Sequence, residues 1–243
     1  MNIKLEVIGF TIDGCRIAQT AGAHRIELCD NPKDGGTTPS YGFIKLARKL
    51  LQIELYPIIR PRGGDFLYNE AEFSIMVEDV KMAKQIGCEG IATGILTRDG
   101  HVDKIRMQQL CALAYPLEVT FHRAFDRTAD PYQALEDIIE SGCERILTSG
   151  QMPYAADGIE LIKLLVEKSD DRIIIMPGSG VNSSNIDDLF KTGATEFHTS
   201  ARIKIKSNME YHNFIMNDIA DTITVDSEEV KRILGKLKIN ANS

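Results

Sequence analysis

The chain has 243 residues, of which 43% are hydrophobic and 26% are charged, and its formal net charge is -7. This length allows a large core, either in one α/β barrel or in two smaller domains. The acidic balance argues against a nucleic-acid binder and against a protein that binds anionic membranes, because both need a basic face. No apolar run approaches the length of a membrane span and the start shows no signal sequence, so we expect a cytoplasmic protein.

Short apolar runs alternate with longer amphipathic runs from end to end, and eight short runs are predicted strands. These strands cover residues 4–9, 25–30, 54–61, 90–96, 118–125, 145–150, 173–178 and 196–201. Helical patterns such as 70–86, 132–141 and 158–168 lie between them. Strict alternation predicts a parallel sheet, and eight units in about 250 residues match a (β/α)8 TIM barrel. We therefore expect one TIM-barrel domain over residues 1–243, with a C-terminal helix at about 226–239.

An internal repeat supports the barrel. Gly22, Gly87, Gly142 and Gly193 each end a predicted helix and are followed by a small residue, two mostly polar residues or glycine, and a strand. Glycine suits the left-handed position that closes a helix. Each copy precedes an even-numbered strand, so the repeating unit is predicted to be βαβα, a quarter of the barrel.

The repeat also aligns the even-numbered strands residue by residue. One level holds Glu27, Ala92, Leu147 and His198, and the next holds Cys29, Gly94, Ser149 and Ser200. Side chains alternate along a strand, and the large apolar residues between these positions should meet the helices. The two levels are therefore predicted to face the barrel interior, and the small side chains of the upper level leave a hollow at the mouth. The same alternation points Glu6, Ile8, Arg60, Thr120 and His122 inward.

Residues 118–126 form the predicted strand with the most polar end. The run starts with β-branched and aromatic residues and finishes with His122-Arg123-Ala124-Phe125-Asp126. Buried polar groups need partners, so this stretch is either an ion-pair cluster under a loop or part of a functional site. Alternation places His122 inside, sends Phe121 and Arg123 outward and leaves Asp126 at the rim. His122 is therefore our first candidate for a functional side chain.

Two other strand ends carry residues suited to anions. Arg60 and Arg62 could clamp a carboxylate or phosphate, since a guanidinium binds two oxygens at once. The alternative is structural: Arg60 neutralises Glu6 or Glu27, and Arg62 pairs with Asp65. The turn after residue 177, with Gly178 and Gly180 and a helix start predicted near residues 183–184, could hold phosphate or could be a tight turn without a ligand.

His122 and His198 could act as a general acid and base or as metal ligands across the predicted mouth. Glu6 and Glu27 could share a proton or hold those histidines in one orientation. Interior positions of a purely structural barrel are usually filled with branched apolar side chains, which favours a functional site here. The predicted substrate-binding or anion-binding residues are Arg60, Arg62, Asp65, Asp126, Ser149, Gly178, Gly180 and Ser200.

Several segments together resemble the CutC family, originally named for copper homeostasis. They are residues 26–29, 35–40, 60–68, 120–126, 147–150 and 177–181. The resemblance implies a cytoplasmic TIM-barrel protein, commonly a homodimer or higher homo-oligomer, with a copper-binding role. Many members carry a cysteine at the end of strand 1 as well as one on strand 2, and a facing pair would suit soft Cu(I). Here Ile8 stands at the first position, so only Cys29 remains as a metal ligand.

Two functions follow from the sequence. In the first, the protein binds Cu(I) through Cys29 and its neighbours and serves copper handling. In the second, it is an enzyme whose His122, His198, Glu27 and Arg60 surround a small phosphorylated or carboxylate metabolite. In both cases the expected partner is a small molecule or a metal ion.

Overall fold

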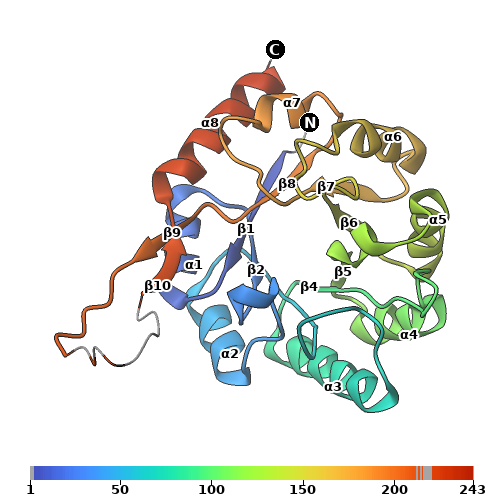
Figure 1. Cartoon of the computed structure of the whole chain (residues 1–243), viewed down its shortest axis with the longest axis horizontal. Helices are drawn as coiled ribbons and strands as arrows, with labels where there is room; N and C mark the ends of the chain where they lie inside the picture. The colour runs from blue at the N-terminus through green and yellow to red at the C-terminus, as the bar shows by residue number, and fades with distance from the viewer. Residues whose placement is uncertain (1–2, 212, 214, 216–220, 243) are drawn as a thin grey trace.

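A computed structural model describes residues 3–211, 213, 215 and 221–242. Its parallel strands form two four-stranded sheets, in the orders β3-β2-β1-β8 and β4-β5-β6-β7, which together make the ring in Figure 1. A parallel bridge between Ile58 and Ala92 joins β3 to β4. The strands are β1 (Lys4–Gly9), β2 (Arg25–Leu28), β3 (Glu54–Pro57), β4 (Gly90–Thr93), β5 (Glu118–Phe121), β6 (Arg145–Thr148), β7 (Ile174–Pro177) and β8 (Glu196–Thr199). The fold is the predicted α/β barrel of eight strands.

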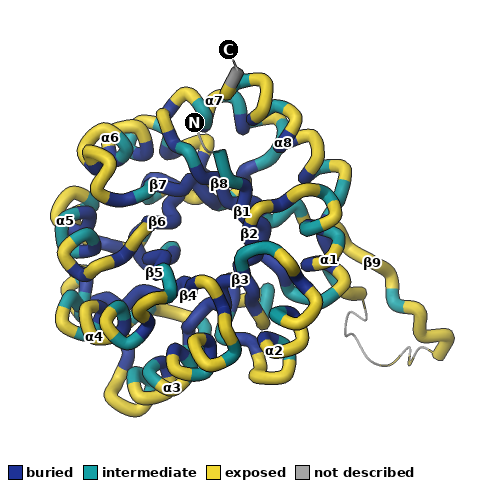
Figure 2. Tube along the Cα trace, turned by 180° about the vertical axis from the view of Figure 1, so that it is seen from behind, coloured by how far each residue is buried: buried dark blue, intermediate teal, exposed yellow. Residues whose placement is uncertain are grey.

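Helices surround the strands, with their exposed faces on the outside of the ring (Figure 2). They are α1 (Ile12–Ala21), α2 (Tyr41–Leu50), α3 (Glu70–Ile86), α4 (Lys104–Ala114), α5 (Pro131–Ser141), α6 (Ile159–Ser169) and α7 (Ile186–Phe190). Asn69 starts α3 with a capping box shared with Glu72, which satisfies amides that the first turn leaves free. Gly22, Gly87 and Gly142 close their helices with φ of 103°, 85° and 87°, as the repeat predicted.

The segment after β8 differs from the prediction. An antiparallel ribbon of β9 (Arg202–Ile205) and β10 (Thr222–Val225) lies outside the ring of strands, and its β10 strand packs against α1 (Figure 1). The last helix, α8 (Ser227–Asn242), starts close to the predicted position, runs past residue 239, and packs against α1 and α7. Among the described residues, no helix has the length and apolarity needed to cross a membrane.

The hydrophobic core lies between the strands and the helices. Ile26, Ile91, Ile146 and Phe197 are fully buried there, together with apolar residues of the helices. This agrees with the predicted alternation, which left the other face of each strand for the barrel interior. Charged residues occupy much of that interior. One group forms a layer of ion pairs, and another group lies around a cavity at the mouth of the barrel.

Candidate functional site

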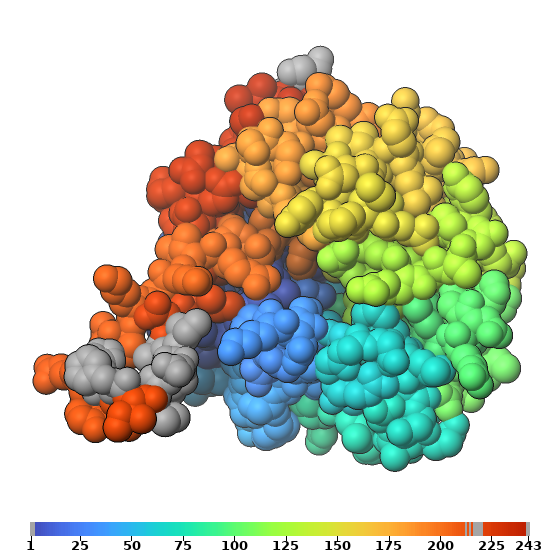
Figure 3. Space-filling model, in the orientation of Figure 1, coloured from blue at the N-terminus to red at the C-terminus, as the bar shows by residue number. Residues whose placement is uncertain are grey.

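A cavity of about 200 Å³ opens at the carboxyl ends of the strands. The space-filling view shows this face hollowed near the centre of the ring (Figure 3). Six predicted site residues line the cavity: Glu27, Arg60, His122, Gly180, His198 and Ser200. The other lining residues are Ile8, Gly35, Ile58, Phe66, Arg123, Leu147, Ser179 and Arg202. Active sites of TIM barrels lie at this end of the fold, so the cavity is the candidate site.

Strand register brings two carboxylates and one imidazole together. Glu6 on β1 lies opposite Arg25 on β2 and opposite His198 on β8. His198 Nδ1 lies 2.7 Å from Glu6 Oε1, and His198 Nε2 lies 3.9 Å from Glu27 Oε2. All three side chains are buried. The predicted grouping of Glu6, Glu27 and His198 is therefore present, with His198 between the two carboxylates.

The two carboxylates are in opposite electrostatic situations. Burial would raise the pKa of Glu6, but Arg25 and His198 more than offset this and lower that pKa to about 2. Burial raises the pKa of Glu27 to about 7, with Glu6 adding to the rise and His198 opposing it. Burial would lower the pKa of His198, yet Glu6 and Glu27 raise it. Because Glu6 is ionised, His198 Nδ1 donates to it, and His198 Nε2 faces Glu27 at 3.9 Å, which is longer than a direct hydrogen bond.

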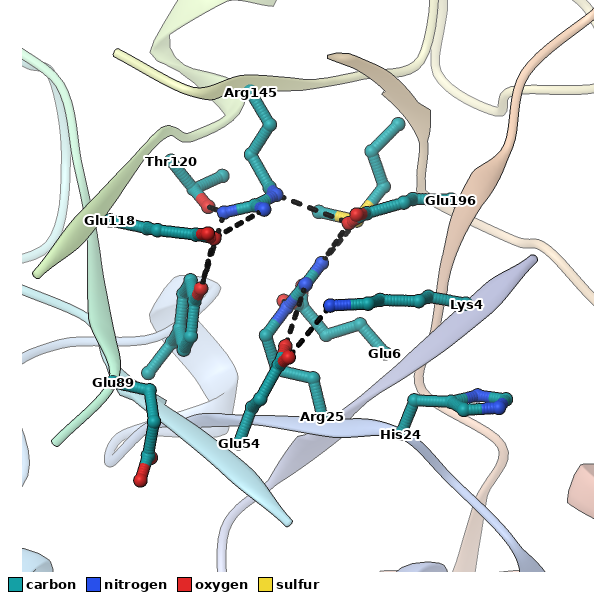
Figure 4. A network of polar contacts seen from close by, with 12 residues as sticks. Lys4, Glu6, His24, Arg25, Glu54, Glu89, Glu118, Thr120, Arg145 and Glu196 are labelled. Atoms are coloured by element: carbon teal, nitrogen blue, oxygen red, sulfur yellow. Dashed lines mark hydrogen bonds and ion pairs between the residues drawn. The ribbon is translucent and has the colours of Figure 1, made fainter. Parts of the chain in front are cut away.

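A layer of ion pairs lies beneath this group, and sequence analysis missed it (Figure 4). Arg25 pairs with Glu6 at 2.5 Å, with Glu54 at 3.2 Å and with Glu196. Arg145 pairs with Glu118 at 2.6 Å and with Glu196 at 3.1 Å. Both guanidinium groups also lie over the ring of Tyr56. Alternation back from Glu27, Leu147 and His198 reaches Arg25, Arg145 and Glu196, so the signal was present in the sequence.

His122 lies in the cavity wall at the end of β5. Its Nδ1 accepts a hydrogen bond of 3.2 Å from the Ala124 amide, and its ring lies 4.9 Å from the ring of Phe66. Its Nε2 is buried and has no hydrogen-bond partner among the described residues. Burial and the nearby Arg60 lower the pKa of His122 to about 3, so the imidazole is neutral at physiological pH.

The strand 3 arginines have structural partners. Arg60 donates through its Nη atoms to three carbonyl oxygens, those of Asp34, Gly36 and Gly64, and does not neutralise Glu6 or Glu27. Arg25 neutralises Glu6 instead, so the expectation that Arg60 pairs with Glu6 or Glu27 was wrong. Arg62 pairs with Glu72 at 2.5 Å and with Asp65 at 2.9 Å. Neither Arg62 nor Asp65 lines the cavity, so the structural pairing proposed for them is present.

Arg123 corrects a second expectation, because it lines the cavity instead of pointing away from the barrel. β5 ends at Phe121, and a 3-10 turn over Arg123–Arg127 replaces the strand alternation. Arg123 pairs with Asp126 at 2.7 Å and donates to Ser149 Oγ at 2.8 Å. Asp126 and Ser149 thus hold Arg123 from behind and do not themselves line the cavity.

Arg202 also lines the cavity and was missed in the sequence. Its exposed side chain lies over the ring of Phe10 at 5.2 Å, and no ion pair or hydrogen bond of it is found among the described residues. It continues the alternating series 196, 198, 200, but it lies beyond the predicted strand. Of the three cavity arginines, Arg202 is the one whose side-chain donors all lack a partner among the described residues; Arg60 leaves only its buried Nε unpaired.

The turn after β7, predicted as a possible phosphate site, forms part of the cavity wall through Ser179 and Gly180. Gly178 packs against Leu147 and His198, where an added Cβ would lie 2.4 Å from Leu147 Cδ1. Ser179 and Gly180 line the cavity with φ of 81° and 71°. α7 begins at Ile186, later than predicted, and has only five residues. The helix start near residues 183–184 was therefore wrong, and this helix is too short to supply a strong N-terminal field.

Cys29 is fully buried and packs with Ile8, Ile58 and Ala92. Burial raises the pKa of its thiol well above the usual range, and Glu27 interacts with it and raises it further. Within the described residues, the group with metal-ligand spacing is Glu6, Glu27 and His198, whose ligand atoms lie within 4.8 Å of one another. Two carboxylates and one imidazole include no soft sulfur ligand, and Glu6 is already paired with Arg25, so this group is a poor match for Cu(I).

Comparison with known proteins identifies the family. The sequence matches the CutC family over residues 3–203. A CutC family protein of Chromobacterium violaceum is 50% identical over 212 residues, which cover 87% of this chain and 86% of the relative. A CutC family protein of Parabacteroides distasonis is 48% identical over 236 residues, covering 93% and 97% of the two chains. This chain belongs to the CutC family.

Solved structures agree on the fold. The crystal structure of a Streptococcus agalactiae protein described as a copper homeostasis protein CutC is 36% identical, with a TM-score of 0.78, covering 82% of this chain and 98% of that one. A thiamine phosphate pyrophosphorylase of Pyrococcus furiosus has a TM-score of 0.62 at 14% identity, covering 98% of this chain and 97% of that one. The second likeness extends to the fold alone.

Proposed function

We propose that this CutC family protein is a cytoplasmic enzyme that acts on a small anionic metabolite, phosphorylated or carboxylate, at the mouth of its barrel. One observation carries the proposal: a single cavity wall combines the Glu27–His198 pair with Arg202, whose donors have no partner among the described residues. A proton-transfer pair beside an available cation is the composition that small anionic substrates require. A small molecule as partner, and the homo-oligomeric state implied by the family, belong to the same proposal.

Glu27 is the proposed general base. Its pKa of about 7 allows it to take and return a proton near physiological pH, where a base of ordinary acidity would hold protons too weakly. The hydrogen bond between His198 Nδ1 and Glu6 orients the imidazole, and Nε2 then lies 3.9 Å from Glu27, a distance that a shared substrate oxygen or a small shift of the carboxyl would bridge. The layer of ion pairs around Arg25 and Arg145, which we call the floor of the barrel, fixes this arrangement, because Arg25 keeps Glu6 ionised. Glu27 and His198 are therefore the proposed catalytic pair, and Glu6 is a positioning residue.

Arg202 is the proposed anion-binding residue. A guanidinium with free donors can bind a carboxylate or phosphate through two hydrogen bonds. Arg123 contributes positive charge at the same mouth, although Asp126 and Ser149 already take up part of its donors. Arg60 holds its Nη atoms on backbone carbonyls and therefore shapes the wall of the cavity.

A thermal-shift screen with phosphorylated and carboxylate metabolites tests the proposal. A ligand at 100 times its Kd stabilises the folded state by about 2.7 kcal/mol, which raises Tm measurably. We expect Arg202→Met to weaken binding of a hit about tenfold and Arg98→Met, an exposed arginine outside the cavity, to leave it unchanged. Glu27→Gln should bind the hit and lose turnover. A complete screen in which no anion raises Tm would overturn the proposal.

Copper binding is a second candidate, favoured by the family and by the contact between Cys29 and Glu27. In this function Cys29 would supply the one soft ligand, with Glu27 in contact with it. Anaerobic titration with Cu(I), using Cys29→Ser and the matched variant Cys88→Ser, separates the candidates. A Cu(I) affinity that Cys29→Ser leaves unchanged excludes the thiol site, whereas a loss specific to Cys29→Ser supports it.

A further inference from the structure

We propose that His122 acts as a neutral hydrogen-bond donor to an oxygen of the substrate, through its Nε2–H, and takes no part in proton transfer. This inference rests on the proposed function and deepens it, since it assigns acid–base chemistry to Glu27 and His198 and oxygen recognition to His122. It also defines the ligand more closely: the substrate must present a carbonyl, carboxylate or phosphate oxygen to the wall formed by the end of β5.

The tautomer follows from the backbone. The Ala124 N–H points at His122 Nδ1 over 3.2 Å, so Nδ1 is the acceptor. A neutral imidazole has one acceptor nitrogen and one donor nitrogen. The proton therefore lies on Nε2, the atom that is buried without a partner among the described residues. The uncommitted polar atom of this ring is thus a donor, on a residue that lines the cavity and just below the cavity surface.

Packing fixes the ring in this orientation. His122 continues the strand pairing, since its amide donates to the Thr93 carbonyl at 2.8 Å. Gly94 leaves the space that the ring occupies, because a Cβ there would lie 2.7 Å from His122 Nδ1. Phe66 covers the ring from another side, with centroids 4.9 Å apart. Turning the ring over would take the acceptor away from the Ala124 amide, so the Nε2–H keeps its direction.

The surroundings also keep the imidazole neutral. The ring is buried, and Arg60 is the charged group that acts on it, which lowers its pKa to about 3. A cationic histidine would need a carboxylate partner in this wall, and none contacts the ring among the described residues. A neutral imidazole is a weaker acid than an imidazolium and stabilises a developing negative charge on oxygen by donating a hydrogen bond to it.

A buried donor without a partner costs stability, and this gives the proposal a distinctive test. His122→Phe keeps an aromatic ring but removes both the Nε2–H donor and the Nδ1 acceptor of the Ala124 amide, so the two effects on stability oppose each other and the urea midpoint should change little. The Kd for the probe anions, inorganic phosphate and malonate, should rise at least tenfold. His122→Gln retains an N–H near the position of Nε2 and should recover part of the affinity.

Nitrogen-15 spectra of protein labelled at its five histidines supply the second measurement. The signal lost in His122→Phe should show the Nε2–H tautomer from pH 5 to 8 and should shift when phosphate or malonate binds. A His122 that titrates in this range, or a His122→Phe variant that binds both anions like the wild type, overturns this inference alone. If the wild-type protein binds neither anion, the anionic substrate of the proposed function fails along with it.

Discussion

The floor and the mouth of this barrel both bury charged and polar groups, but they treat them in opposite ways. At the floor, each guanidinium of Arg25 and Arg145 contacts at least two carboxylates, and the ring of Tyr56 lies under both. At the mouth, His122 Nε2 and the side chain of Arg202 have no hydrogen-bond partner among the described residues. Charge alone therefore does not mark the site.

The difference indicates which part is structural. The buried charges at the floor are stable because each is paired with opposite charges. Replacing one partner leaves the remaining charges buried without compensation, which destabilises the folded protein. A donor left unsatisfied at the mouth has no such compensation in the ligand-free protein. The two regions meet at Glu6, which pairs with Arg25 below and with His198 above. The floor therefore sets the electrostatics on which the mouth depends.

Removing Arg25 should produce the largest change. Arg25→Met leaves Glu6 and Glu196 buried with reduced compensation, and we expect the free energy of unfolding at pH 7 to fall by roughly 3–5 kcal/mol. The pKa of Glu6, which is about 2 in the intact protein, should rise once Arg25 is gone. The loss should therefore be smaller at pH 5 than at pH 8, because a protonated Glu6 is less costly to bury.

Urea denaturation of Arg25→Met at both pH values makes this measurement. Arg172→Met is the matched control, since Arg172 pairs with Glu136 at 2.7 Å on the surface. An exposed pair contributes about 1 kcal/mol or less. Equal losses in the two variants would mean that the floor does not stabilise the barrel through its ion pairs.

A smaller change is expected from Gly94→Ala, which acts on the mouth. The added Cβ would meet His122 Nδ1 at 2.7 Å and Ala124 Cβ at 3.0 Å, so the imidazole must move. Overpacking of this kind costs roughly 1–3 kcal/mol. The same shift should weaken phosphate binding, because it displaces His122 Nε2. Calorimetric titration measures the affinity for phosphate, and thermal unfolding measures the change in Tm. Gly42→Ala, whose Cβ would meet nothing within 4 Å, should change neither quantity adversely.

Much of the fold could be predicted from the sequence. The eight strands, the helix over residues 70–86 and the left-handed glycines follow from local patterns that tertiary structure did not override. The β9–β10 ribbon was not predicted: Arg202–Ile205 alternates charged and apolar residues over only four residues, and all four are exposed, so the alternation there marks no buried face. β9 has no buried face of the kind that makes a strand visible in a sequence, and in β10 Thr224 and Val225 are the buried residues.

The site was predictable only where strand alternation holds. His198 and Glu27 were located because β8 and β2 are regular at those positions. Arg123 was misplaced because the 3-10 turn begins directly after His122, and alternation has no meaning there. Arg25 and Arg145 were missed for another reason: fully buried arginines are rare, and only the spatial meeting of their carboxylate partners makes them acceptable.

Glu27 allows the mouth to be tested through pH alone. Its folded-state pKa of about 7 lies above its ordinary value of 4.5 because of burial. A raised pKa stabilises the folded protein fully below the unfolded pKa, and this contribution is lost as pH rises through the folded pKa. His198, whose pKa is also raised, acts in the same direction. The pKa values of Glu6 and His122 are lowered, so these two groups change the stability of the folded protein only below their ordinary pKa values. Above pH 6.5 they do not oppose the loss of stability caused by Glu27 and His198.

Glu27→Gln should therefore gain stability relative to the wild type as pH rises from 5 to 7.5, by roughly 1–2 kcal/mol. Glutamine keeps the shape of the protonated carboxyl and cannot ionise, and its neutrality also returns the pKa of His198 toward the ordinary value. Unfolding free energies of both proteins across this range give the difference directly, with the exposed Glu167→Gln as the control. A difference that does not change with pH would show that Glu27 is not the carboxyl with the raised pKa, and the proton-transfer role would then pass to His198.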